Sequence, residues 1–135
     1  MTLQPAVAPR SGGIPRRIVT GIGPNLRSFR WATGQIRSIH RRLPSEGVKA
    51  RVPLATGMGP RGWRGVRAAV AVLRPTCLER ALVVQAWVGG YTAVPDVVIG
   101  VRNESSVEAH AWIDGPDPYY DPSYAELTRL AYDAG

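Results

Sequence analysis

The feature that most constrains this chain is a capped, almost wholly apolar helix that begins at its only cysteine. Thr76 lies where a helix N-cap belongs and Glu79 follows three residues later, which is the T-x-x-E pattern of a capping box. The segment Cys77–Val88 is apolar nearly all round after its first turn, and a Gly-Gly pair follows it. A helix of this composition must pack against other elements on all its faces. We therefore predict that it is the central buried helix of the fold.

The position of Cys77 indicates a chemical role for the thiol. At the first helical position, unpaired backbone N–H groups and the positive end of the helix dipole favour a thiolate over a thiol. The alternative is that the cysteine is an inert small hydrophobe in an apolar segment. A nucleophilic cysteine needs a base, which in proteins is usually a histidine.

The chain has two histidines. His40 lies beside two arginines in a basic segment, where it has no evident partner. His110 lies in A-H-A-W, 33 residues after Cys77, on a predicted strand that could lie against the start of the helix. The imidazole would also need an orienting carboxylate. We prefer Asp121, which a returning segment could place beside His110. The competing carboxylates are Asp114 and Asp117.

Periodicity and turn signals predict an α+β fold. We expect helices over residues 25–43, 63–73, 77–88 and 124–132, the last with Leu127, Leu130 and Ala131 on its inner face. We expect strands over residues 96–102 and 107–113, paired as an antiparallel hairpin, and a short third strand over residues 119–121.

Charge divides the chain into two unlike halves. Residues 1–67 carry 13 Lys and Arg against one acid, whereas residues 68–135 carry 4 against 9, for a net charge of +7. We expect a disordered, basic Gly/Pro-rich tail over residues 1–24, a basic helical segment and connector over residues 25–60, and the domain that holds the cysteine and histidine over residues 61–135. The basic face could contact nucleic acid, but a solvated amphipathic helix is the simpler interpretation, and we expect no nucleic-acid partner.

The remaining motifs mostly exclude functions. One cysteine rules out an intramolecular disulfide and a Cys-rich zinc site, so we expect a reducing, cytoplasmic protein with no metal and no cofactor. Residues 1–13 lack the apolar core of a secretory signal, and the apolar runs are too short to span a bilayer, so we expect no membrane association. Residues 57–62 match G-x-G-x-x-G without a preceding strand, so we do not assign a dinucleotide loop.

Three strings together resemble a known family. C-L-E-R-A-L-V-V-Q, then V-V-I-G-V-R-N, then E-A-H-A-W-I-D-G are similar to the transglutaminase-like, papain-like cysteine proteases that remove the leader from lasso-peptide precursors. The resemblance covers about Val66–Asp121 and implies a reduced transglutaminase/papain core, with the cysteine helix packed on an antiparallel sheet. It implies that Cys77 is the nucleophile and His110 the base. The D-P-[ST] element that carries the acid in the wider family matches Asp121-Pro122-Ser123.

The resemblance also implies an activity and partners. The substrate would be a ribosomally made precursor peptide, and the partners a small leader-binding protein and a separate ATP-dependent lasso cyclase. No side-chain oxyanion donor is evident, so the backbone N–H of Cys77 is the candidate. Trp112, Tyr119 and Tyr120 could line a peptide cleft. Two alternatives stay open: a transglutaminase-like acyltransferase with the same triad, and a non-enzymatic basic module that binds nucleic acid.

Overall fold

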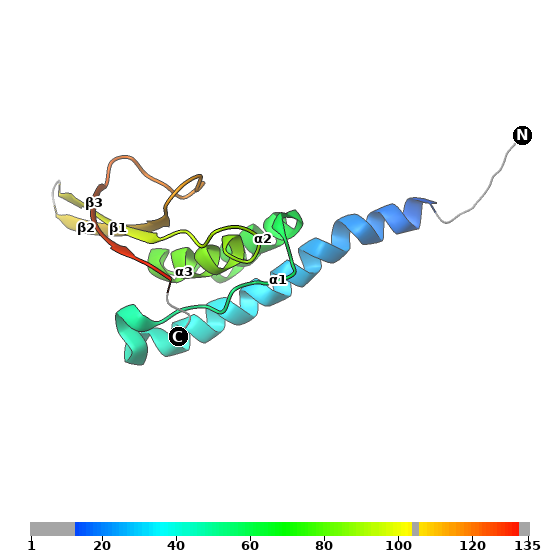
Figure 1. Ribbon diagram of the computed structural model, residues 1–135, viewed down its shortest axis with the longest axis horizontal. Helices are drawn as coiled ribbons and strands as arrows, with labels where there is room; N and C mark the ends of the chain where they lie inside the picture. Colours follow the sequence, from blue (N-terminus) through cyan, green and yellow to red (C-terminus); the bar gives the residue numbers. More distant parts are fainter. Residues whose placement is uncertain (1–12, 104–105, 133–135) are drawn as a thin grey trace, which may run out of the picture.

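The computed structural model describes residues 13–103 and 106–132 of the chain, and within these ranges the fold is α+β, as predicted (Figure 1). The elements in chain order are α1 (Gly13–Glu46), the 3-10 turns η1 (Gly47–Lys49) and η2 (Pro60–Gly62), α2 (Trp63–Leu73), α3 (Cys77–Val88), β1 (Val97–Asn103), β2 (Val107–Ile113) and β3 (Ala125–Leu130).

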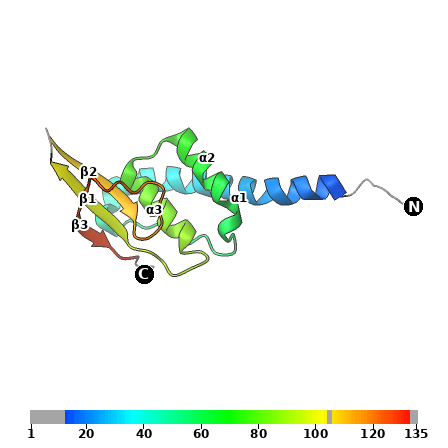
Figure 2. The same ribbon diagram turned by 90° about the horizontal axis from the view of Figure 1, so that it is seen from above.

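Helix α3 lies between the sheet on one side and α1 on the other (Figures 1 and 2). Every residue of α3 from Ala81 to Trp87 is buried, which confirms the prediction of a central buried helix. The indole ring of Trp87 meets that of Trp31 on α1, with the ring centroids 5.7 Å apart. Burial of large apolar side chains on both sides of α3 is the main force that holds the layers together.

The predicted capping box at the start of α3 is present. The Thr76 hydroxyl accepts the N–H of Glu79 at 3.2 Å, and the Glu79 carboxylate accepts the N–H of Thr76 at 3.0 Å. Because the two bonds satisfy donors that a helix start leaves open, they fix the chain direction just before Cys77.

Helix α1 begins at Gly13, well before the helix start that we expected at residue 25. Residues 1–12 lie outside the described part of the chain. The sequence predicts a helix break at Pro24, yet the helix continues through it into a tightly packed segment. The side chain of Asn25 accepts the N–H of Gly65 on α2 at 3.2 Å. Tertiary contacts of this kind override local propensity, which is a weak signal.

Helices α1 and α2 touch at small residues. A Cβ at Gly65 would lie 2.1 Å from the carbonyl oxygen of Asn25, and one at Gly62 would lie 2.7 Å from the side chain of Ser28. The Ser28 hydroxyl, fully buried, donates to the carbonyl of Gly62. Gly62, which ends the G-x-G-x-x-G string, therefore serves helix packing in this fold.

The segment between α1 and α2 belongs to the core. Ala50, Val52 and Ala55 are all buried, and the N–H of Ala55 donates to the carbonyl of Ala86 on α3 at 3.0 Å. Helix α1 contributes Ile36 and other residues to the same core. Residues on both sides of position 60 thus share one hydrophobic core.

The sheet has the strand order β2-β1-β3, and both pairings are antiparallel. The predicted hairpin is confirmed, with Val97 opposite Ile113 and Gly100 opposite His110. Strand β2 therefore lies at one edge of the sheet. Ala111 and Ile113 pack in the core against α3, so the alternation of a strand places His110 and Trp112 on the opposite face.

The C-terminal segment is a strand, and the predicted helix over residues 124–132 was wrong. The spacing of its leucines is compatible with a helix, but β1 offers an open edge, and Leu130 pairs opposite Val97 there. Backbone pairing with β1 decides the conformation, and Leu127 is left 66% exposed. The predicted strand over residues 119–121 was also wrong: these residues lie in the loop between β2 and β3.

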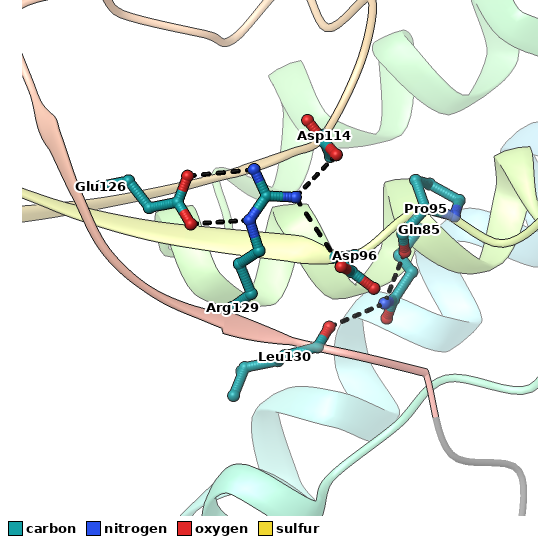
Figure 3. Close-up of polar contacts among 7 residues, drawn as sticks. All are labelled: Gln85, Pro95, Asp96, Asp114, Glu126, Arg129 and Leu130. Carbon is teal, nitrogen blue, oxygen red and sulfur yellow. Dashed lines mark hydrogen bonds and ion pairs between the residues drawn. The ribbon is translucent and has the colours of Figure 1, made fainter.

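Buried Gln85 fastens α3 to the sheet (Figure 3). Its side-chain amide donates to the carbonyl of Pro95 at 2.9 Å and to that of Leu130 at 3.4 Å. One side chain therefore fixes the entry to β1 and the end of β3 against the same helix. Within the described residues, no helix is long and apolar enough to cross a membrane.

Candidate active site

Cys77 is the first residue of α3, is not disulfide-bonded and is partly exposed. The capping box uses the N–H groups of Thr76 and Glu79, and the N–H of Arg80 donates to the carbonyl of Thr76 at 2.9 Å. The N–H groups of Cys77 and Leu78 lie at the helix start, where a helix supplies no acceptor of its own. They are placed to receive a negatively charged oxygen beside the thiol.

The loop over residues 114–124 covers the sheet face that carries His110. The ring of Tyr124 lies 5.0 Å from that of His110, and the ring of Trp112 stacks with the imidazole at 5.8 Å. Tyr120 meets Trp112 edge-on at 5.5 Å. His110 is therefore packed against aromatic rings on the outer face of the sheet.

The same loop also meets α3. Pro116 and Pro118 line a pocket of about 270 Å³ together with Val84 and Val88 of α3. Further along the loop, the guanidinium of Arg80 lies 4.1 Å above the ring centre of Tyr119. The loop thus contacts both α3 and the outer sheet face.

The imidazole of His110 makes one hydrogen bond in the described part of the chain. Its Nε2 lies 2.8 Å from the carbonyl oxygen of Tyr119. A carbonyl can only accept, so Nε2 carries the proton and donates. In the neutral ring, Nδ1 is then the basic nitrogen.

The sequence also shows which family the chain belongs to. Residues 25–130 match the sequence profile of the transglutaminase-like superfamily. The chain belongs to this superfamily. No curated protein and no solved structure gives a significant match. Members of the transglutaminase-like superfamily are typically cysteine hydrolases.

The three carboxylates considered for the transglutaminase-like site have different partners. Asp114 accepts from the guanidinium of Arg129 at 2.7 Å, on the outer side of β3 (Figure 3). Asp117 accepts the N–H of Ile113 at 2.7 Å and that of Tyr119 at 2.9 Å, so it closes the first part of the loop. None of the three is hydrogen-bonded to His110 in the described residues.

Asp121 is the carboxylate whose charge reaches His110. Hydrogen bonds from the hydroxyl and the N–H of Ser123 hold the pKa of Asp121 below its usual value. The positive charges of Arg102 and His110 lower this pKa further, although they contribute less than the hydrogen bonds. The carboxylate of Asp121 is therefore bonded to its own turn.

Cys77 and His110 form no hydrogen bond with each other in the described residues, and the catalytic pair stays a prediction. The contacts that link the two regions pass through Tyr119, which meets Arg80 on α3 with its ring and His110 with its carbonyl. Of the aromatic residues expected to line a cleft, Trp112 and Tyr120 line a pocket of about 330 Å³ beside Asp114.

Two contacts at this site were missed by the sequence reasoning. His40, for which we saw no partner, has one: its Nδ1 lies 2.7 Å from the buried carboxylate of Glu79. The second contact is the carbonyl of Tyr119. The sequence signals only the turns on either side of it, because Asp117 and Asp121 each precede a proline and each accept the N–H two residues later, as in an Asx turn.

We also considered which residues could hold a metal ion. Across residues 13–103 and 106–132, no group of three or more His, Cys, Asp or Glu side chains is close enough to hold one.

Proposed function

We propose that the chain is a cysteine peptidase that removes the leader from a ribosomally made precursor during lasso-peptide biosynthesis. The observation that carries the peptidase proposal is the position of Cys77 at the capped first turn of the buried helix of a transglutaminase-like fold. The finer assignment to lasso precursors rests on the three resembling strings that contain Cys77, Ile99 and His110.

In the proposed reaction, Nδ1 of His110 takes the proton from the thiol of Cys77. The thiolate attacks the carbonyl carbon of the bond between leader and core, and the N–H of Cys77 stabilises the oxyanion. The imidazolium then gives its proton to the departing amine of the core peptide. Water attacks the thioester with His110 as base, which releases the leader as a carboxylate and restores the thiol.

Asp121 completes the proposed triad through its charge. A carboxylate near His110 favours the imidazolium that forms when Cys77 loses its proton. The lowered pKa of Asp121 supports this role, because the group stays ionised at any pH at which the histidine is neutral. The hydrogen bond that orients the ring is the one that Nε2 of His110 donates to the carbonyl of Tyr119.

The substrate and partners follow from the same resemblance. We propose that the leader lies along the surface near Trp112 and Tyr120, whose pocket adjoins the His110 face of the sheet. A separate leader-binding protein would present the precursor, and an ATP-dependent cyclase would use the freed amine.

A second candidate is an acyltransferase, which the superfamily match supports equally. The thioester would form in the same way, and an amine in place of water would attack it. The two activities differ only in the acceptor.

The experiment is to incubate the purified chain with precursor peptides encoded near its gene, with and without a candidate leader-binding protein, and to identify the products by mass spectrometry. A peptidase yields free leader and core. Added methylamine gives a leader methylamide only if an amine competes with water. Cys77→Ala should abolish every product. The control variant, His40→Ala, should still form them. Cleavage that survives Cys77→Ala would contradict both candidates.

A further inference from the structure

We propose that Tyr119 is the residue that positions His110 for Cys77, with its carbonyl orienting the imidazole and its ring fixing the loop to the cysteine helix. The proposal rests on the proposed Cys77–His110 nucleophile. It assigns to a main-chain carbonyl the directional role that a triad usually gives to a carboxylate. Asp121 keeps only the role of a nearby negative charge.

The first support is the hydrogen bond itself. At 2.8 Å the contact between Nε2 of His110 and the Tyr119 carbonyl is of normal length, and it sets which ring nitrogen is protonated. The two oxygens of Asp117 accept the N–H groups of Ile113 and Tyr119, so the carbonyl is presented by a closed turn and not by a loose chain.

The second support is the contact of the Tyr119 ring with Arg80. Arg80 follows Cys77 by three residues, and residues at this spacing lie on the same face of a helix. Its guanidinium lies 4.1 Å above the ring centre, and one of its terminal nitrogens is buried without a hydrogen-bond partner. A buried, incompletely bonded guanidinium is costly, and the aromatic ring offsets part of that cost. The contact therefore ties the loop to the face of α3 that carries the thiol.

Tyr119 makes both of these contacts, one with its ring and one with its carbonyl. From Cys77 the path runs one helical turn to Arg80, then to the ring of Tyr119, and from its carbonyl to His110. If the ring leaves Arg80, the carbonyl is no longer held at a fixed place relative to α3. His110 would then keep its strand position, but its imidazole would lose the acceptor that orients it.

The first test reads the tautomer directly by nitrogen-15 NMR of the two histidines in the wild-type chain. His110 should show a proton on Nε2 that exchanges slowly with water, whereas His40, bonded through Nδ1 to Glu79, should carry its proton on Nδ1. Asp121→Asn should leave the protonated Nε2 of His110 unchanged. A His110 proton on Nδ1, or an Nε2 proton that exchanges rapidly, would overturn the proposal.

The second test measures the rate at which iodoacetamide alkylates Cys77, at pH 6 and at pH 9. Tyr119→Ala should slow alkylation about tenfold at pH 6 and leave it unchanged at pH 9, where any thiol ionises without help. Tyr119→Phe keeps the ring and the carbonyl and should behave as wild type. Tyr91→Ala is the matched control, because it removes a tyrosine that packs on Trp87 instead.

The outcomes separate this proposal from the proposed function. A Tyr119→Ala chain that stays folded and alkylates as wild type at pH 6 would show that the ring does not position His110. If instead the wild-type thiol itself reacts only at alkaline pH, the Cys77–His110 pair fails. The tautomer of His110 then shows separately whether its imidazole is bonded to the carbonyl of Tyr119. Should Tyr119→Ala unfold, Arg80→Met tests the same contact from the helix side, with the same expected loss at pH 6.

Discussion

The buried carboxylate of Glu79 joins the first turn of α3 to α1 through His40. One of its oxygens accepts the N–H of Thr76 at 3.0 Å, and the other lies 2.7 Å from Nδ1 of His40. Only 6% of the Glu79 side chain is exposed, against 73% for His40. The capping box is thereby anchored to α1, and this contact stabilises the turn that carries Cys77.

Glu79→Ala should destabilise the protein more than Thr76→Ala does. Loss of the Thr76 cap costs about 1 kcal/mol, whereas loss of Glu79 removes the reciprocal bond, leaves the N–H of Thr76 without an acceptor and frees His40, at a total of about 2–3 kcal/mol. Urea unfolding followed by circular dichroism measures both. Thr76→Ser, which keeps the hydroxyl, is the control and should lie within about 0.5 kcal/mol of wild type. Equal effects for the two alanine variants would contradict the bridging role of Glu79.

Two glycines in helices should respond in opposite ways to alanine. At Gly65 a methyl group would meet the backbone of Asn25, so Gly65→Ala should cost about 1–3 kcal/mol through forced separation of α1 and α2. At Gly34 nothing lies within 4 Å, and Gly34→Ala should stabilise the protein by about 0.5–1 kcal/mol because alanine favours the helix. Thermal unfolding of the two variants gives the comparison. A stabilised Gly65→Ala would show that α1 and α2 are not in close contact.

The sequence predicted the elements whose signals are local. The capping box marked the start of α3 at Cys77, and the β-branched run and turn marked the β1–β2 hairpin. Prediction from the sequence failed where contacts with residues distant in the chain decide the secondary structure. The segment Ala125–Leu130 is a strand because β1 has a free edge, and α1 continues through Pro24, where the side chain of Asn25 bonds to Gly65 of α2. Local propensity could not anticipate either result.

The ion pairs of Arg129 should make the stability of the sheet depend on pH. The hydrogen bond from Arg129 lowers the pKa of Glu126 below its usual value. Because a lowered pKa favours the folded state only while the carboxyl is ionised, the contribution is present above about pH 4.5 and is lost as the pH falls through the folded-state pKa. Arg129→Leu should therefore lower the urea midpoint at pH 7 and have a smaller effect near pH 2.5. Arg67→Leu, an exposed arginine on α2, is the control. An Arg129→Leu deficit that is the same at both pH values would contradict the assignment.

Asp121→Asn separates charge from orientation at His110. The variant keeps an acceptor for the N–H of Ser123 but removes the charge, so the imidazolium loses its support. We expect kcat/KM for the proposed peptidase to fall about tenfold, since a charge–charge attraction near a protein surface is worth about 1 kcal/mol or more. A loss of a thousandfold or more would indicate that Asp121 hydrogen-bonds to His110 directly, as in an ordinary triad. Asp114→Asn is the control, because Asp114 is bonded to Arg129.

The candidate site was only partly accessible to sequence reasoning, for a physical reason. Residue types and spacing identify Cys77 and His110, because a thiol at a helix start and a histidine on a following strand are local facts. The partner of a histidine is set by the path of a loop. A main-chain carbonyl, such as that of Tyr119, has no residue-type signature at all.

The alkylation of Cys77 by iodoacetamide as a function of pH tests the central claim most directly, because it needs no substrate. A thiol paired with His110 should react at about pH 6 nearly as fast as at pH 9, and His110→Gln should reduce the rate at pH 6 about tenfold or more without changing it at pH 9. His40→Gln should have no such effect. If wild type and His110→Gln both react only as the pH rises above about 8, as an ordinary thiol does, Cys77 and His110 do not form a catalytic pair.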